Sequence, residues 1–169
     1  MNDTVVYAGA FGLRNVTTKE PMKTANVFHW ASVSKTFVAT AVMQLAEQGK
    51  INLDDKLIAY LPYFKQKDEN YKYITIRQML NHTSGIGDVE DYEWDKPQND
   101  EAAPERFVRG LENDKMLFAP GSDWSYSNTA FEILGVVITK VSGMPFETYV
   151  RKNILDPLGM EHSSFIYPE

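Results

Sequence analysis

Cysteine is absent from this chain of 169 residues. That absence excludes a disulfide framework, a thiolate nucleophile and a cysteine metal site. Long apolar runs are also missing, since none approaches the roughly 18 residues that a membrane-spanning helix needs. The N-terminal residues Met1–Thr4 have neither the basic region nor the apolar core of a signal peptide, and the sequence leaves the compartment open.

Positive charge is scarce as well. The 17 Lys and Arg side chains are outnumbered by 23 Asp and Glu, which gives a formal net charge of -6. Phosphate binding needs clustered Lys and Arg, so nucleic acid and an anionic membrane surface are excluded as partners. Apolar residues make up 43% and charged residues 24%, and together with the length this indicates one ordinary globular domain.

Two short apolar segments near the N-terminus, 5–8 and 27–30, predict β-strands. Gly12, Asn15 and Pro21 lie between them and predict loop and turn. Segment 1–31 is therefore expected to form a short β-hairpin.

Farther along, apolar residues recur at the spacing of amphipathic helices. The pattern predicts helices over 37–46, 57–61, 76–80, 104–111, 131–141 and 145–154. Thr75 is the expected cap of the third helix, which ends near Gly85, and Gly49 and Gly143 are the expected stops of the first and fifth. Residues 86–104 are rich in Gly, Asp, Glu, Asn and Pro and predict a long surface loop.

The acidic and aromatic residues of that loop either line the rim of a cleft or are exposed to solvent. Most loops lie on the protein surface, which favours the second interpretation. These residues are Glu90, Asp91, Glu93, Trp94 and Asp95.

The segment Ser32–Lys35 puts a serine and a lysine one turn apart at the start of a predicted helix, so their side chains share a face. A serine hydroxyl is a poor nucleophile until a nearby base takes its proton, and a lysine amine can be that base. The alternative is a helix N-cap serine followed by a solvated lysine. This S-x-x-K spacing is common, so it does not by itself distinguish a catalytic pair from a helix cap.

A second polar set, Tyr126–Asn128, follows the turn-rich segment 120–124 at the mouth of a predicted helix. A tyrosine beside an ammonium group has its phenolate favoured and can exchange a proton with a serine or a leaving group. An asparagine amide both donates and accepts, so it can hold a substrate amide or the lysine. The alternatives are a tyrosine at the rim and an asparagine that caps a helix.

These two segments occur in a fixed order with three further motifs. The motifs are Leu80–Ile86 (L-N-H-T-S-G-I), Val141–Phe146 (V-S-G-M-P-F) and Leu155–Met160 (L-D-P-L-G-M). Together they resemble the class C β-lactamase and penicillin-binding-protein-like serine hydrolases, from about Tyr7 to Ser164. The Y-x-N form, in place of S-x-N, points to the class C, D-aminopeptidase and esterase branch.

The resemblance implies a role for each residue. Ser32 is similar to the acylated nucleophile of the family, Lys35 to its partner base and Tyr126 to its proton-transfer group. Asn128 resembles the residue that orients substrate and lysine. Whether Lys35 or Tyr126 takes the first proton stays open. The Ser32 backbone N–H would supply one half of an oxyanion hole.

The histidines receive no catalytic or metal role. In the family the H-T-S-G segment is structural, so His82 is not expected to be the general base. His29 and His162 fit no metal spacing, and we expect neither a metal nor another cofactor.

The resemblance implies an α+β fold, the mostly helical part of a β-lactamase/transpeptidase-like domain with a short N-terminal β-hairpin and an incomplete sheet. We expect a single partial domain over 1–169, with a sheet-forming hairpin at 1–31 and a mainly helical region at 32–169. The family's third motif, a K-T-G or H-x-G triplet on the strand that carries the second oxyanion donor, has no counterpart in this sequence. Because an isolated hairpin is marginally stable and has open edges, we expect a piece of a longer protein, a truncated gene product, or a chain that completes its sheet with another copy.

Two function classes follow. The first is a serine hydrolase that forms an acyl-enzyme on Ser32 and hydrolyses a β-lactam, a small ester or a D-amino-acid peptide. The second is a weakly active or non-catalytic member of the fold that binds a peptide or a partner. The expected partners are a small-molecule or peptide substrate and, for sheet completion, a second copy of the chain.

Overall fold

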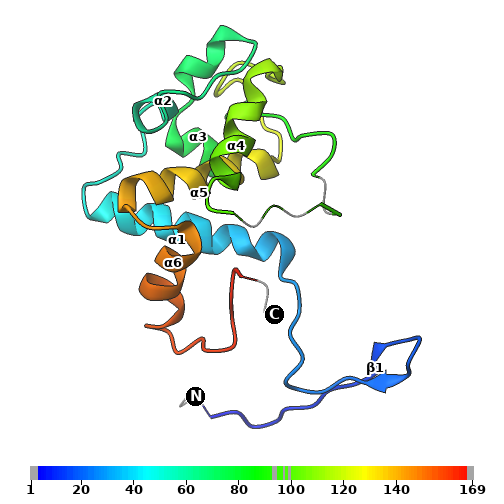
Figure 1. Cartoon of the computed structure of the whole chain (residues 1–169). Helices are drawn as coiled ribbons and strands as arrows, with labels where there is room; N and C mark the ends of the chain where they lie inside the picture. Colours follow the sequence, from blue (N-terminus) through cyan, green and yellow to red (C-terminus); the bar gives the residue numbers. More distant parts are fainter. Residues whose placement is uncertain (1–3, 93–94, 97, 99, 167–169) are drawn as a thin grey trace. The chain divides into compact units, whose positions relative to one another are not determined.

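The computed structural model describes residues 4–92, 95–96, 98 and 100–166. The chain forms two compact units, Met1–Ala31 and Ser32–Glu169. Figure 1 shows the hairpin of the first unit in blue and the helices of the second in cyan to orange.

The first unit contains an antiparallel pair of strands, β1 (Leu13–Asn15) and β2 (Glu20–Pro21). The Asn15 side chain starts the turn between them, because its Oδ1 accepts the backbone N–H groups of Thr17 and Thr18 at 2.9 and 3.0 Å. The N-terminal β-hairpin expected from the sequence is therefore confirmed.

The strands nevertheless lie in a different place from the one predicted. Segments 5–8 and 27–30 have no regular secondary structure, and Val5, Val6 and Phe28 are 78%, 97% and 62% exposed. The strands predicted there are wrong, because a strand needs a neighbour to bind its backbone groups and no described residue forms a ladder with these segments. The hairpin forms instead in the segment that Gly12, Asn15 and Pro21 had marked as loop.

The second unit is helical. Its α-helices are α1 (Ser34–Glu47), α2 (Leu57–Tyr60), α3 (Ile76–Leu80), α4 (Ala103–Gly110), α5 (Asn128–Ser142) and α6 (Phe146–Val150). The tighter or wider turns are η1 (Ala31–Val33), at the border of the two units, η2 (Glu69–Tyr73), η3 (Leu111–Asn113) and the π-helical η4 (Arg151–Leu155).

Each predicted helix is present, although α1 and α5 begin three residues earlier than predicted and two other helices end differently. The third helix ends at Leu80 rather than near Gly85, because residues 82–85 bind another segment of the chain instead of continuing the helix. The last predicted helix changes to a π-helical turn after Val150. The short turns η2 and η3 were not predicted, since so few residues show no periodicity.

Helices α1 and α5 lie side by side at the centre of the second unit (Figure 1). α3 and α4 pack on α5, and α6 packs on both central helices. Fully buried side chains at helical spacing join α1 to α5, and they are Ala41, Val42, Leu45, Ile133, Leu134, Val137 and Ile138. This packing sets the first turn of α1 against the first turn of α5.

Among the described residues, no single helix has the length and apolar composition of a membrane span. Segments Asn128–Ser142 and Phe146–Leu155 pass that test only as a pair bent by 75°.

Candidate active site

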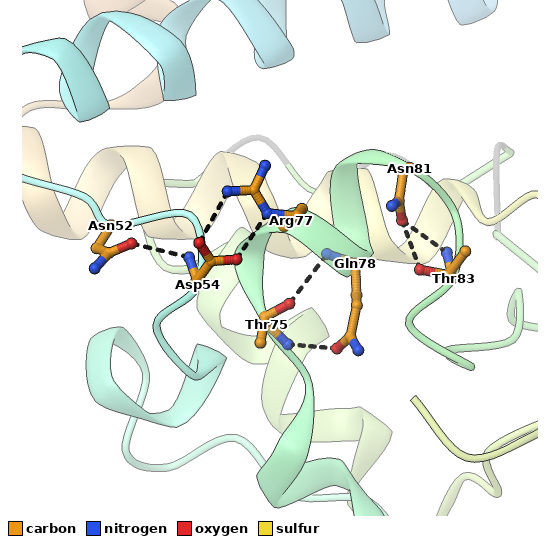
Figure 2. A network of polar contacts seen from close by, with 7 residues as sticks. All are labelled: Asn52, Asp54, Thr75, Arg77, Gln78, Asn81 and Thr83. Carbon is orange, nitrogen blue, oxygen red and sulfur yellow. Dashed lines mark hydrogen bonds and ion pairs between the residues drawn. The ribbon is translucent and has the colours of Figure 1, made fainter. Parts of the chain in front are cut away.

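A polar network surrounds α3, the helix that precedes the H-T-S-G segment (Figure 2). The Thr75 hydroxyl accepts the Gln78 backbone N–H at 3.2 Å, and the Gln78 side-chain oxygen accepts the Thr75 N–H at 2.9 Å, which makes a capping box. Arg77 binds both oxygens of Asp54, at 2.7 and 2.9 Å. These contacts fix the helix that leads into the H-T-S-G segment.

The H-T-S-G segment, residues 82–85, holds the chain that leads up to Tyr126. Three backbone N–H groups of 117–125 donate to its carbonyl oxygens at 2.8 to 3.0 Å. The pairs are Leu117 with Gly85, Gly121 with Thr83 and Ser125 with His82. The motif therefore serves to position the loop that carries the tyrosine.

Gly85 is required where these two segments cross. Its φ of +78° lies in the left-handed region, and a Cβ atom there would come within 2.1 Å of the Phe118 carbonyl oxygen. No other residue fits this position without displacing the Tyr126 loop.

The His82 side chain supports the same loop. Its Nδ1 accepts the Ser127 backbone N–H at 3.2 Å, and its ring lies 4.6 Å from the Tyr126 ring. Burial lowers the pKa of His82, the positive charge of Lys35 lowers it further, and Asp88 acts in the opposite direction. A neutral His82 with an accepting Nδ1 matches the structural role expected for it.

Helix α5 begins directly after the tyrosine. Ser127 is fully buried and is the N-cap, since its hydroxyl accepts the Ala130 N–H at 3.0 Å. Asn128 is the first residue of the helix, so the reading of Asn128 as the capping residue is wrong. Its side chain therefore does not cap α5 and instead reaches Lys35 of α1.

Ser32 and Lys35 come from η1 and the first turn of α1. The N-cap position of α1 is Val33, without a side-chain cap, so the alternative of an N-cap serine is not met. Tyr126 Oη donates to Ser32 Oγ at 2.7 Å, and Lys35 Nζ donates to Asn128 Oδ1 at 2.5 Å. The structure thus brings together all four residues that the sequence singled out.

The Lys35 ammonium also lies 4.7 Å from the centre of the Tyr126 ring. Burial alone would raise the pKa of Tyr126, but hydrogen bonds to Lys35 and Ser32 and the lysine charge outweigh it, so the pKa lies below its ordinary value of 10.0. Tyr126 is 40% exposed, so a molecule from solvent can reach the hydroxyl pair. The phenol is therefore disposed to exchange a proton with the serine.

Glu132 lies one turn after Asn128 on α5. Its surface remains exposed, yet the atoms around its carboxyl displace enough water to raise its pKa. Lys35 opposes this rise and Glu147 adds to it. The charge of Lys35 therefore acts on Glu132 as well as on Tyr126 and His82.

Asp88 is the site residue that sequence reasoning missed. Its carboxylate accepts the Asn128 side-chain N–H at 2.8 Å and the backbone N–H groups of Asn128 and Thr129 at 2.6 and 3.1 Å. It lies in a segment interpreted as surface loop, and its position three residues after Gly85 was the only signal. Of the other residues considered there, Glu93 and Trp94 lie outside the described residues.

Among the residues that the structure describes, no group of three or more His, Asp or Glu side chains could hold a metal ion. The side chains that the described site brings together carry a hydroxyl, a phenol, an ammonium, an amide and the Asp88 carboxylate.

The fold and the ordered motifs define a protein of the serine β-lactamase and penicillin-binding-protein type. The chain belongs to the Beta-lactamase family, whose model matches residues 2–169. A penicillin-binding protein of Bacillus subtilis (strain 168) is 35% identical over 94% of this chain. Esterase EstB of Burkholderia gladioli is 30% identical over 98% of it.

Among solved structures, the octameric penicillin-binding protein homologue from Pyrococcus abyssi superposes with a TM-score of 0.76 and 33% identity. It covers 94% of this chain and 37% of its own. The chain likewise spans 35% of the Bacillus relative and 45% of the Burkholderia esterase. The chain therefore spans less than half the length of each of these relatives.

Proposed function

We propose that this chain carries the acylation centre of a serine hydrolase, with Ser32 as nucleophile, Lys35 and Tyr126 as proton-transfer groups, and Asn128 orienting the lysine and the substrate. The 2.7 Å hydrogen bond between Tyr126 Oη and Ser32 Oγ is the observation that carries the proposal. It lies within the reach that a general base needs.

The proposed chemistry begins when Ser32 Oγ attacks a carbonyl carbon and loses its proton. A Tyr126 phenolate or a neutral Lys35 amine takes that proton. The same pair returns it to the leaving group as the bond between the carbonyl carbon and the leaving group breaks, which leaves the acyl group on Ser32. Water then hydrolyses the acyl-enzyme.

The substrate class follows from the relatives. They include penicillin-binding proteins and an esterase, and the Y-x-N motif resembles the D-aminopeptidase branch as well. We therefore propose that the acyl donor is a β-lactam, a small ester or a D-amino-acid peptide. The hydroxyl pair is open to solvent, which suits an acyl donor that binds from outside.

A weakly active or non-catalytic binding role is the second candidate, and one sequence observation favours it. No Lys or His of this chain begins a K-T-G or H-x-G triplet, so the strand that supplies the second oxyanion donor in the family has no counterpart. Loss of one such donor slows acylation by about 100- to 1,000-fold. We therefore expect slow acylation by this chain alone.

Covalent labelling separates the two candidates. The protein is incubated with a fluorescent penicillin or a fluorophosphonate probe and analysed on a denaturing gel. We expect slow labelling of the wild type, none of Ser32→Ala, and unchanged labelling of Ser34→Ala, which removes the other hydroxyl of the same turn. Labelling that survives Ser32→Ala, or a folded wild type that stays unlabelled at high probe concentration, contradicts the acyl-enzyme.

Self-association is a further part of the proposal. The Pyrococcus homologue is octameric, and the first unit of this chain exposes several apolar side chains beside a two-stranded sheet. We propose that a second copy pairs with this sheet, since unpaired strand edges attract other strands.

A further inference from the structure

We propose that Asp88 is a positioning residue, which holds the Asn128 amide in the one orientation that presents its oxygen to Lys35. This inference deepens the proposed function and rests on it for its catalytic meaning. Its structural part rests on the contacts of Asp88 alone.

The orientation of an asparagine amide is set by its neighbours, because oxygen and NH₂ are almost equal in shape. An ionised carboxylate only accepts hydrogen bonds and an ammonium only donates them. Asn128 lies between the two, with its Nδ2 donating to Asp88 Oδ2 at 2.8 Å and its Oδ1 accepting from Lys35 Nζ at 2.5 Å. A flipped amide would set donor against donor at the lysine and acceptor against acceptor at the aspartate.

Asp88 is itself fixed by the start of α5. Its other oxygen accepts the backbone N–H groups of Asn128 and Thr129 at 2.6 and 3.1 Å. These are among the N–H groups that a helix leaves without a partner in its own backbone, and the helix dipole favours a negative charge there. The carboxylate thus ties the loop after the H-T-S-G segment to the helix and to the amide together.

The contacts form a continuous path from Asp88 through Asn128 to Lys35. Lys35 in turn lies against Tyr126, which binds Ser32. Asp88 does not touch the serine, so it acts through Asn128. Without Asp88, only Lys35 would distinguish the two orientations of the Asn128 amide. The position of Lys35 itself depends on the amide oxygen, so the lysine alone would hold the amide less firmly.

The test uses Asp88→Asn as the decisive variant, because asparagine is as good a helix cap as aspartate. Its oxygen still accepts the two backbone N–H groups, but its NH₂ faces the NH₂ of Asn128. We expect the melting temperature to change little and the rate of Ser32 acylation by a fluorescent penicillin to fall about 10- to 100-fold. Equal rates in Asp88→Asn and the wild type would overturn the proposal.

A double-mutant cycle then asks whether Asp88 acts through Asn128. Asn128→Ala should lower the acylation rate, and adding Asp88→Asn to it should produce little further loss. Two independent, multiplying losses would mean that Asp88 acts in another way, and the proposal would fail.

A readout without catalysis separates this inference from the proposed function. In a proton–nitrogen NMR spectrum, the Asn128 side-chain amide is assigned by its absence in Asn128→Ala. Its signals should shift and exchange faster with solvent in Asp88→Asn, even if the wild type is never acylated. Unchanged Asn128 signals would overturn the positioning role, whatever the acylation experiment shows.

Discussion

At the scale of single residues, the Tyr126 hydroxyl is the contact on which the proposed proton transfer depends. Tyr126→Phe removes only the oxygen that binds Ser32 and leaves the ring against His82 and Lys35. General acid–base groups contribute roughly 100- to 10,000-fold, so we expect the acylation rate to fall within that range. The rate of labelling by a fluorescent penicillin measures it.

Tyr73→Phe provides the matched control, because this tyrosine is 62% exposed and has no part in the site. Both variants should melt close to the wild type. A Tyr126→Phe chain that is acylated as fast as Tyr73→Phe would exclude the phenol from the reaction.

His82 gives the structure a specific dependence on pH. Its pKa in the folded chain lies below the ordinary 6.5, because burial and Lys35 disfavour the charged ring. His82 therefore binds a proton more readily in the unfolded chain than in the folded one. The stability that the neutral ring contributes is fully present above about pH 6.5, the ordinary pKa. It is lost as the pH falls through the lower pKa of the folded chain. We expect the melting temperature to fall on acidification across this window.

His82→Asn isolates this contribution. Asparagine tolerates the left-handed backbone at residue 82, where φ is +63°, and offers an oxygen to the Ser127 N–H, but it does not titrate. Melting curves of both proteins from about pH 7 to about pH 5 should show a smaller loss in the variant. Equal losses would mean that other groups carry the acid sensitivity.

The family resemblance carried by the ordered motifs predicted Ser32, Lys35, Tyr126 and Asn128 as one site, whereas each motif taken alone left a structural alternative open. Asp88 was not predicted. Its role depends on the contact between the irregular segment after Gly85 and the start of α5. Irregular segments have no hydrophobic periodicity, so this contact cannot be predicted from the sequence pattern.

At the scale of elements, the crossing of the H-T-S-G segment with residues 117–125 is the most constrained contact. Gly85→Ala adds a Cβ atom only 2.1 Å from the Phe118 carbonyl oxygen. The backbone at this position also has a φ of +78°, which strains any residue with a Cβ. Strain and overlap together should lower the free energy of unfolding by about 2–5 kcal/mol. Urea denaturation measures this loss.

Gly49→Ala is the matched control, since its φ is +70° but nothing lies within 4 Å of the added Cβ. It should cost only about 1–2 kcal/mol, from the backbone conformation. If the two variants lose the same stability, the close approach at Gly85 has no energetic consequence.

The helices were predictable and the strands were not, for a physical reason. The buried faces of α1 and α5 consist of apolar residues that recur at helical spacing in the sequence. Thr75 marks the start of α3 and Gly143 the end of α5, and the structure has both boundaries there. A helix satisfies its own backbone, whereas a strand depends on another segment. Segments 5–8 and 27–30 have the composition of strands, but no described residue forms a strand ladder with them, so they do not become strands.

At the scale of the whole molecule, the exposed apolar side chains of the first unit predict association. Light scattering after size exclusion should give a mass above the 19.3 kDa of one chain. Val6→Lys places a charge at a side chain that is 97% exposed, so it should leave the fold intact and weaken association between copies. A wild type that is strictly monomeric would exclude pairing between copies.

The central claim is that contacts reaching from Tyr126 and Lys35 make Ser32 the reactive hydroxyl of this chain. The most direct measurement is peptide mass spectrometry after incubation with benzylpenicillin. Cleavage after Lys and Arg releases peptide 24–35, which contains both Ser32 and Ser34, and fragmentation distinguishes them. We predict the added acyl mass on Ser32 alone, with none in Ser32→Ala. An adduct on Ser34 or elsewhere, or no adduct on a correctly folded chain, would contradict the account.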